Sequence, residues 1–296
     1  MYSDENTKRF IAELHRLTGL PDNLIEKDVW QTFILRHLCS DKILKNKLIF
    51  KGGTCLIRTL LGYYRFSEDL DFAWKDGQKR GFYRKFEREF LTKLETIGVR
   101  VGKHYGTRGG KLMKWDLLCG AGGDIIIVLS VNFSEEIIFP VVRRKLKTLK
   151  VVSRERKKLY ALFRDITQAY YSKLQLRCYS AEEIACEKFA AVLTRRDLRK
   201  PRDLIDLFEL QKIVNLSALS KNKKVAGKIH RSVMSSPAYV GIFKQRKRDI
   251  PTYLDRLEEE SKTESEIYIK MPDRAELMRF LVYVLKPIFK KLCRKI

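Results

Sequence analysis

The sequence offers little that would place the chain in a membrane or outside the cell. No apolar run is long enough to cross a bilayer, because the longest candidate, residues 124–133, is short and bounded by polar residues. The first ten residues, MYSDENTKRF, lack the basic and then apolar layout of a secretory signal peptide. We therefore expect a cytoplasmic protein without a membrane partner.

Cysteine and histidine are sparse and scattered. The six cysteines and four histidines share no spacing typical of metal ligands. The pattern therefore argues against a zinc site and against a disulfide framework, and it favours a reducing compartment.

Acidic residues are also few relative to basic ones. The 296-residue chain has 61 Lys and Arg against 36 Asp and Glu, a formal net charge of +25 at pH 7. Its 45% hydrophobic and 11% aromatic residues exclude a disordered chain, so the charge belongs to a folded protein. A folded domain this basic favours a polyanionic partner, most commonly nucleic acid, although a protein that is merely basic remains an alternative.

The residue patterns change along the chain, which indicates two parts. Helical spacing of apolar residues over 5–20 and 22–38 precedes short strands at 47–50 and 70–74. A helix is expected over 82–97, and residues 99–139 carry β patterns that include a strand at 125–133. The chain beyond Ser180 is almost entirely helical in character, with helices expected over 181–194, 201–213, 216–235, 250–262 and 273–295. We predict an α+β fold: a domain over residues 1–175 with N-terminal helices and a mixed or antiparallel sheet, then a helical domain over 176–296.

The most informative segment is RFSEDLDF, residues 65–72. On a strand, Asp69 and Asp71 project from the same face while Leu70 and Phe72 face the core. Two neighbouring carboxylates suit Mg²⁺, which takes few protein ligands and completes its shell with water and substrate phosphates. A solvated surface strand would show the same pattern.

A glycine-opened turn precedes this segment. The expected strand at 47–50 leads into Gly52, Gly53 and Thr54 and then a helical stretch from Cys55 to Leu61. Glycines at a helix start allow a phosphate to approach the backbone amides, and the Thr54 hydroxyl adds a donor. Alone, this is an ordinary strand–helix turn. Followed closely by the two aspartates, it places phosphate and divalent metal side by side, as phosphoryl or nucleotidyl transfer requires.

These motifs together resemble a known family. FKGGT at 50–54 and RFSEDLDF at 65–72 are similar to motifs of the AbiEii/AbiGii nucleotidyltransferase toxins of type IV toxin–antitoxin systems, which include the MenT toxins. Further similar positions are Ile25-Glu26-Lys27-Asp28, Glu187-Lys188, Arg195, Arg202-Asp203 and Asp206-Leu207. The resemblance spans about residues 20–210.

The resemblance implies a polymerase-β-like nucleotidyltransferase fold. It further implies transfer of a nucleoside monophosphate from an NTP, with release of pyrophosphate, to the 3′ acceptor end of tRNA, which blocks translation. A cognate antitoxin is then an expected partner. The strongly basic composition fits a tRNA substrate independently, because Lys and Arg neutralise phosphates on binding.

The candidate site residues divide into four groups. Lys188 and Asp203 take their catalytic roles from the resemblance; a mid-helix lysine that reaches out to solvent and an acid that favours a helix start are the alternatives. The basic stretch at 143–158 is a candidate for contact with the tRNA backbone, with a solvated charged loop as the alternative. The groups are: catalytic, Asp69, Asp71, Lys188 and Asp203; metal (Mg²⁺ or Mn²⁺), Asp69 and Asp71; nucleotide-binding, Gly52, Gly53, Thr54, Arg65, Ser67 and Lys188; RNA-binding, Arg143, Arg144, Lys145, Arg195 and Arg202.

One position departs from the pattern of polymerase-β-like enzymes. Their third carboxylate would fall near Ser130, and Asp124 lies about 20 Å away along an extended strand. Two other functions therefore stay open. One is a nucleotidyltransferase that modifies a protein or a small molecule such as an aminoglycoside, although the positive charge disfavours a cationic acceptor. The other is a basic RNA-binding module with a vestigial nucleotide site.

Overall fold

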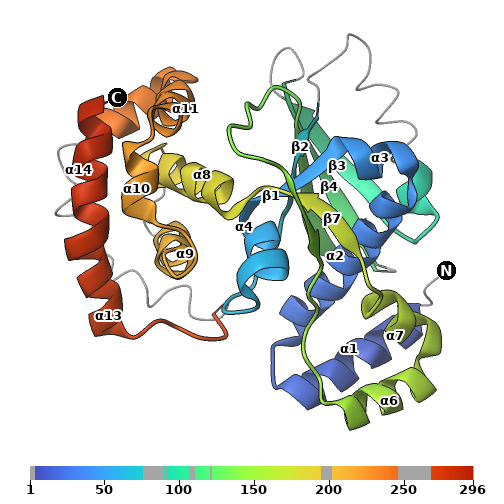
Figure 1. Ribbon diagram of the computed structural model, residues 1–296. Helices are drawn as coiled ribbons and strands as arrows, with labels where there is room; N and C mark the ends of the chain where they lie inside the picture. The colour runs from blue at the N-terminus through green and yellow to red at the C-terminus, as the bar shows by residue number, and fades with distance from the viewer. Residues whose placement is uncertain are drawn as a thin grey trace. The chain divides into compact units, whose positions relative to one another are not determined.

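A mixed sheet forms the centre of the N-terminal part of the chain in the computed structural model (Figure 1). The strand order is β3-β4-β5-β2-β1-β7-β6. Strand β1 pairs antiparallel with β2 and parallel with β7, while β2 pairs parallel with β5. The strands are β1 (Leu48–Lys51), β2 (Leu70–Trp74), β3 (Arg100–Gly106), β4 (Leu112–Cys119), β5 (Ile125–Asn132), β6 (Val142–Lys145) and β7 (Gln175–Cys178).

The structure describes residues 4–75, 90, 92–106, 111–120, 122–194, 202–245 and 268–295. The chain forms two units, which we treat separately. The first comprises Met1–Glu135 and Val141–Cys178, and the second comprises Glu136–Pro140 and Tyr179–Ile296. The expected helix over 250–262 and most of the one over 82–97 lie outside the described residues.

The sheet confirms the predicted α+β fold. Along β4, buried and partly exposed residues alternate, which is the period-two pattern of a strand with one face on the core. Strand β2 is buried at Leu70, Phe72, Ala73 and Trp74, so only Asp71 breaks its apolar surface. Strands β6 and β7, at and next to one edge of the sheet, were not expected from the sequence.

Helices of the first unit pack around the sheet. Helix α2 is apolar on most of its circumference, so it is largely buried. Asp41 caps α3 by accepting hydrogen bonds from the amides of Ile43 and Leu44. The helices are α1 (Asp4–Thr18), α2 (Asp22–Ser40), α3 (Lys42–Lys47), α4 (Gly52–Cys55), the π-helix η1 (Leu56–Leu61), α6 (Ser153–Leu162) and α7 (Arg164–Tyr170).

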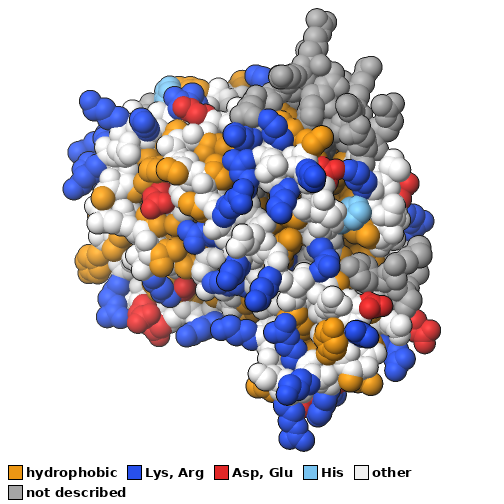
Figure 2. Space-filling model, turned by 45° about the vertical axis from the view of Figure 1, so that its right-hand side comes forward, with side chains coloured by type: hydrophobic (Ala, Val, Ile, Leu, Met, Phe, Trp, Pro, Cys, Tyr) orange, Lys and Arg blue, Asp and Glu red, His pale blue; other side chains and the backbone are white. Residues whose placement is uncertain are grey.

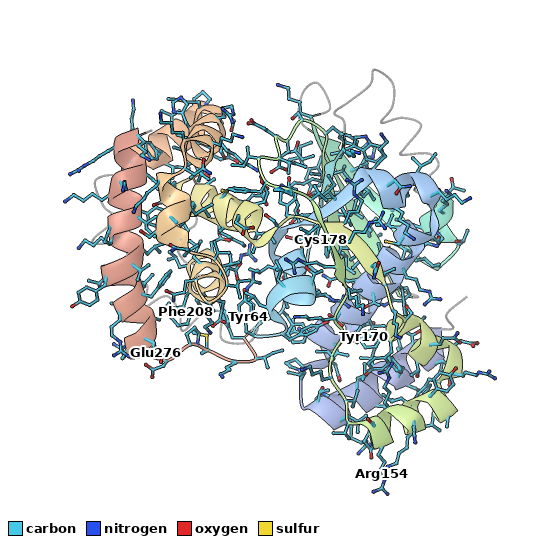
Figure 3. The ribbon with its side chains drawn as sticks, in the orientation of Figure 1. Tyr64, Arg154, Tyr170, Cys178, Phe208 and Glu276 are labelled. Carbon is cyan, nitrogen blue, oxygen red and sulfur yellow. The ribbon has the colours of Figure 1, made fainter. Side chains whose placement is uncertain are left out.

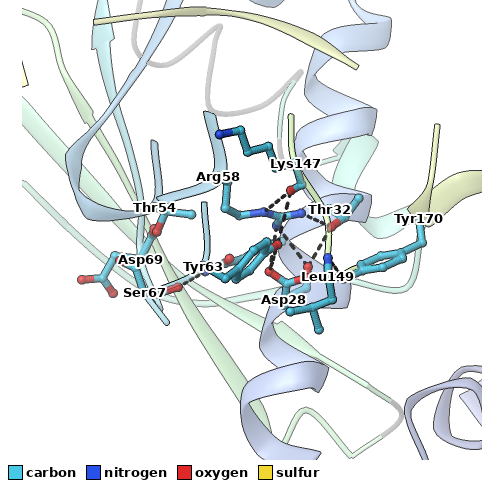
Figure 4. Close-up of polar contacts among 11 residues, drawn as sticks. Asp28, Thr32, Thr54, Arg58, Tyr63, Ser67, Asp69, Lys147, Leu149 and Tyr170 are labelled. Atoms are coloured by element: carbon cyan, nitrogen blue, oxygen red, sulfur yellow. Dashed lines mark hydrogen bonds and ion pairs between the residues drawn. The ribbon is translucent and has the colours of Figure 1, made fainter. Parts of the chain in front are cut away.

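A buried polar cluster around Asp28 ties these helices together (Figure 4). The Asp28 carboxylate accepts hydrogen bonds from the hydroxyls of Tyr63 and Tyr170, at 2.7 and 2.6 Å, and lies 3.4 Å from an Arg58 nitrogen. Arg58 also donates to the Thr32 hydroxyl and to the carbonyl of Lys147. Burial raises the pKa of both tyrosines well above the ordinary value, so they remain protonated donors. The cluster anchors η1, which directly continues the glycine turn, to α2.

The second unit is helical in its described part. Phe208, labelled in Figure 3, packs edge-to-face on Phe280, and Phe189 packs edge-to-face on Phe289. The single helix expected over 216–235 is interrupted at Asn222, whose side chain caps α11. The helices are α8 (Ala181–Thr194), α9 (Arg202–Leu210), α10 (Leu216–Lys221), α11 (Lys223–Met234), α13 (Arg274–Arg279), the π-helix η3 (Phe280–Leu285) and α14 (Lys286–Lys295).

The described helices of both units share one further property. None combines the length and the apolar character needed to span a bilayer.

Candidate active site

Asp71 lies in a polar row that crosses the middle of the sheet. The strand registers place it between Lys51 on β1 and Ser130 on β5. The Ser130 hydroxyl donates a 2.5 Å hydrogen bond to Asp71 Oδ1. Ser130 thus occupies the place next to Asp71 where a third carboxylate was considered, whereas Asp124 is exposed and precedes β5. The neighbour of Asp71 on β5 is therefore a neutral hydroxyl.

Gly52 permits the close approach of Asp71 to the turn. Its φ of +75° is in the left-handed region, which side chains disfavour. A Cβ at this position would also collide with the Asp71 carboxylate. Both the backbone conformation and the neighbouring carboxylate therefore require glycine here.

Gly53 brings the remaining nucleotide-binding candidates together. The position that a Cβ would occupy on Gly53 lies 2.8 Å from Arg65 Nη2 and 2.9 Å from Ser67 Oγ. Arg65 is only 1% exposed, and its Nη1 donates to the Phe66 carbonyl at 2.7 Å, which fixes the guanidinium. A cation and a hydroxyl therefore converge on the backbone of the glycine turn.

Thr54 links the glycine turn to the carboxylate segment. Its side chain is 1% exposed, and its hydroxyl donates a 2.5 Å hydrogen bond to the backbone carbonyl of Asp69. The Asp69 carboxylate is directed away from the Asp28 cluster, and Asp69 is an exposed residue (Figure 4). Thr54 therefore positions the carboxylate segment, and its predicted contact with phosphate stays a prediction.

Helix α2 supports the same segment from another side. Lys27 forms an ion pair with Glu68, and the Gln31 amide donates to the Ser67 carbonyl at 2.9 Å. On the neighbouring strand β1, Lys51 forms a separate ion pair with Glu135, at 2.5 Å. No role was predicted for Lys27 or Gln31, although the motif Ile25-Glu26-Lys27-Asp28 connected this helix with the family.

The second unit holds a buried ionic cluster. Lys188 Nζ lies 2.8 Å from Asp203 Oδ1 and 2.5 Å from Asp206 Oδ2, and the three residues are 7%, 3% and 0% exposed. The structure thus brings together Lys188 and Asp203, two of the predicted catalytic residues. Asp206 was not among the predicted site residues. The signals for it were the similarity of Asp206-Leu207 to the family and its position three residues after Asp203, on the same face of α9.

The predicted RNA-binding residues on β6 point to different faces of the strand. Side chains alternate along β6, so Arg143 and Lys145 are exposed while Arg144 is partly buried on the other face, with its Nε unpaired among the described residues. Arg202 is half-buried at the start of α9. Arg195 lies outside the described residues.

The acidic residues set a limit on metal binding. No three His, Cys, Asp or Glu side chains of the described residues gather around a common point. Asp69 and Asp71 supply two carboxylates, and Mg²⁺ is commonly held by one or two carboxylates together with substrate phosphates. The donor set fits one divalent cation that a bound nucleotide completes.

A mixed sheet with an aspartate pair beside a glycine-opened turn defines the class of nucleotidyltransferases. The comparison with protein families agrees: the profile described as "Nucleotidyl transferase AbiEii toxin, Type IV TA system" matches residues 34–265. The chain therefore belongs to the AbiEii family of nucleotidyltransferase toxins of type IV toxin–antitoxin systems, which confirms the resemblance seen in the sequence.

A solved structure with the same fold covers almost the whole chain, and a second shows weaker similarity. MenT4, a nucleotidyltransferase toxin from Mycobacterium tuberculosis H37Rv, is 21% identical with a TM-score of 0.52, over 96% of this chain and 98% of that one. The antibiotic-resistance factor ANT(2'')-Ia is 13% identical with a TM-score of 0.31, over 78% of this chain and 98% of that one. No curated protein sequence matches.

The collision at Gly52 gives a testable prediction. Gly52→Ala should lower nucleotidyl transfer by about 100-fold, because displacing Asp71 by even about 1 Å disrupts the reactive geometry. Gly98→Ala is the matched control: Gly98 has a similar φ of +82°, but no atom lies within 4 Å of its Cβ position. Both variants should lose about 1–2 kcal/mol of stability from the backbone conformation. Transfer rates give the activities, and denaturation curves give the stabilities. Equal activities of the two variants would show that the contact between Gly52 and Asp71 does not matter for transfer.

Proposed function

We propose that this protein transfers a nucleoside monophosphate from an NTP to the 3′ acceptor end of tRNA, with release of pyrophosphate. The observation that carries the proposal is the convergence of Asp71, Arg65 and Ser67 on the glycine turn. Such a turn accepts phosphates, and the carboxylates next to it accept a metal bound to those phosphates.

Each part of the site has a proposed task. The amides of Gly52 and Gly53, the Arg65 guanidinium and the Ser67 hydroxyl bind the β- and γ-phosphates, which leave as pyrophosphate. Asp69 and Asp71 hold Mg²⁺ or Mn²⁺, which would neutralise charge on the phosphates during transfer. Ser130 and Thr54 orient the two aspartates through their hydrogen bonds.

The charge of the protein favours a nucleic-acid acceptor. The excess of 61 basic over 36 acidic residues suits a polyanion and opposes binding of a cationic small molecule. The basic exposed residues of β6 and of α6, such as Arg143 and Arg154, are candidate contacts for RNA phosphates (Figure 3). Modification of tRNA at its acceptor end would block aminoacylation, and a cognate antitoxin would relieve the block.

Incubation with each α-³²P-labelled NTP, Mg²⁺ and total tRNA tests the proposal. We expect label on tRNA that depends on the metal and is lost when the 3′ terminal hydroxyl is oxidised beforehand. Label on the protein itself, with none on tRNA, would replace the proposal with protein modification. Retention of tRNA without any label would replace it with an RNA-binding module whose nucleotide site is inactive.

A further inference from the structure

A basic pocket of about 510 Å³ lies in the first unit, beside β6 and β7. Its cations come from four different elements or their connections: Arg36 on α2, Lys45 on α3, Arg143 on β6, Lys173 before β7 and Arg177 on β7. None of the described residues that line it is acidic, and none belongs to the predicted catalytic or nucleotide-binding set. The pocket is therefore a separate concentration of positive charge.

The strand register places two of these cations directly against each other. Arg143 is opposite Arg177 in the antiparallel pairing of β6 with β7. Like charges directly opposite one another destabilise a sheet, so the arrangement costs stability unless an anion lies between them. Arg177 is also held by a hydrogen bond to the Asn46 carbonyl of α3, which keeps its guanidinium at the pocket.

Carboxylates of the described residues do not neutralise the cluster. In the ranges that the structure describes, none of the five cations forms an ion pair with Asp or Glu. Burial raises the pKa of Cys39, which also lines the pocket, to about 12, so its thiol stays neutral and adds no negative charge. The charge of the pocket is therefore available to an external anion.

The character of the lining distinguishes between kinds of anionic partner. Protein interfaces depend on large apolar anchors, and none of the exposed large hydrophobic side chains of the described residues lines this pocket. Three of the five cations are arginines, whose planar fork binds phosphate oxygens in pairs. Figure 2 shows a face of the molecule on which Lys and Arg side chains predominate over acidic ones, as a long polyanion would require.

We infer that this pocket binds phosphate groups of the RNA backbone, as a second anchoring point apart from the candidate active site. The inference rests on the proposed function, because it assumes an RNA acceptor. Arg143 shares one face of β6 with the exposed Lys145, which lies outside the pocket lining, and their Cα atoms are about 6.7 Å apart along the strand. The pocket thus binds the body of the RNA and leaves its reacting end free.

The test compares two double variants that remove the same charge. Arg143→Gln/Lys173→Gln neutralises two exposed pocket cations, and Lys103→Gln/Lys111→Gln neutralises two exposed cations near β3, at the opposite edge of the sheet. Binding of a fluorescein-labelled tRNA transcript is followed by anisotropy over a series of salt concentrations. The pocket variant should bind about 10-fold more weakly, and its slope of log K against log salt should be smaller by about 1.4–1.8, as two lost phosphate contacts predict.

Two controls separate this inference from the proposed function. Binding of an NTP with Mg²⁺, measured without RNA, should be the same in the pocket variant and the wild type. If the wild type labels tRNA while the pocket variant keeps its tRNA affinity and salt slope, the pocket inference is wrong and the proposed function stands. If the wild type neither binds nor labels tRNA, the proposed function itself fails. Unchanged tRNA binding with loss of antitoxin inhibition would instead assign the pocket to an acidic protein.

Discussion

Replacing Asp71 with asparagine is expected to slow nucleotidyl transfer by about 1,000-fold while leaving the fold intact. The substitution keeps the size of the side chain and its ability to accept a hydrogen bond from the Ser130 hydroxyl 2.5 Å away. It removes one of the two negative charges proposed to hold the metal and the triphosphate together. Because a serine stands where a third carboxylate would lie, no neighbouring acid on β5 replaces the lost charge.

The control for this experiment is Asp124→Asn. Asp124 is the acidic residue immediately before β5 and is exposed, so the same chemical change there should leave the rate within about two-fold. Single-turnover rates at saturating NTP, together with circular dichroism and thermal denaturation, make the comparison. A rate for Asp71→Asn close to that of the wild type would show that Asp71 is not part of the site. A large loss of rate in Asp124→Asn would show that the metal is bound near Asp124 instead.

The second large effect is expected at Lys188. Lys188→Met leaves Asp203 and Asp206 buried without the ammonium that lies 2.8 and 2.5 Å from them, and loss of a buried ionic partner costs about 3–5 kcal/mol. Lys212→Met is the matched control at the surface. Lys212, just after the end of α9, forms an ion pair with Glu209 near the end of that helix, and loss of this pair should cost less than about 1 kcal/mol. Urea denaturation curves give both values.

A triple variant separates a role in folding from a role in catalysis. Lys188→Met/Asp203→Asn/Asp206→Asn removes all three charges, and it should recover much of the lost stability because no carboxylate stays buried without a partner. If Lys188 acts on the substrate, transfer by the fully folded triple variant should remain at least about 100-fold below that of the wild type. Recovery of both stability and activity would show that the cluster is structural only.

The accuracy of the sequence analysis depended on how local each feature is. Strands β2 and β5 carry apolar runs bounded by polar residues, and α8 carries a continuous apolar face, so their limits were predicted within one or two residues. Strand β6 has the sequence VRRK, without apolar alternation, and it is extended because it pairs with β7, thirty residues further on. Such pairing cannot be read from the residues of β6 themselves.

In the candidate site, too, local features could be predicted and long-range contacts could not. The spacing of Asp69 and Asp71 and the glycines at 52 and 53 indicated the chemistry directly. The Thr54 hydroxyl, however, bonds a carbonyl 15 residues away, and Lys27 contacts Glu68 across 41 residues. Neither contact could be predicted from the sequence, because the fold and not the local spacing decides which distant groups become hydrogen-bond partners.

The most direct measurement is a crystal structure of the protein with Mn²⁺ and a non-hydrolysable NTP analogue, with anomalous scattering to locate the metal. The account predicts a manganese peak within coordination distance of the Asp69 and Asp71 carboxylates. It also predicts the β- and γ-phosphates on the amides of Gly52 and Gly53, next to Arg65 and Ser67. A well-ordered nucleotide bound elsewhere, or a metal that touches neither aspartate, would contradict it.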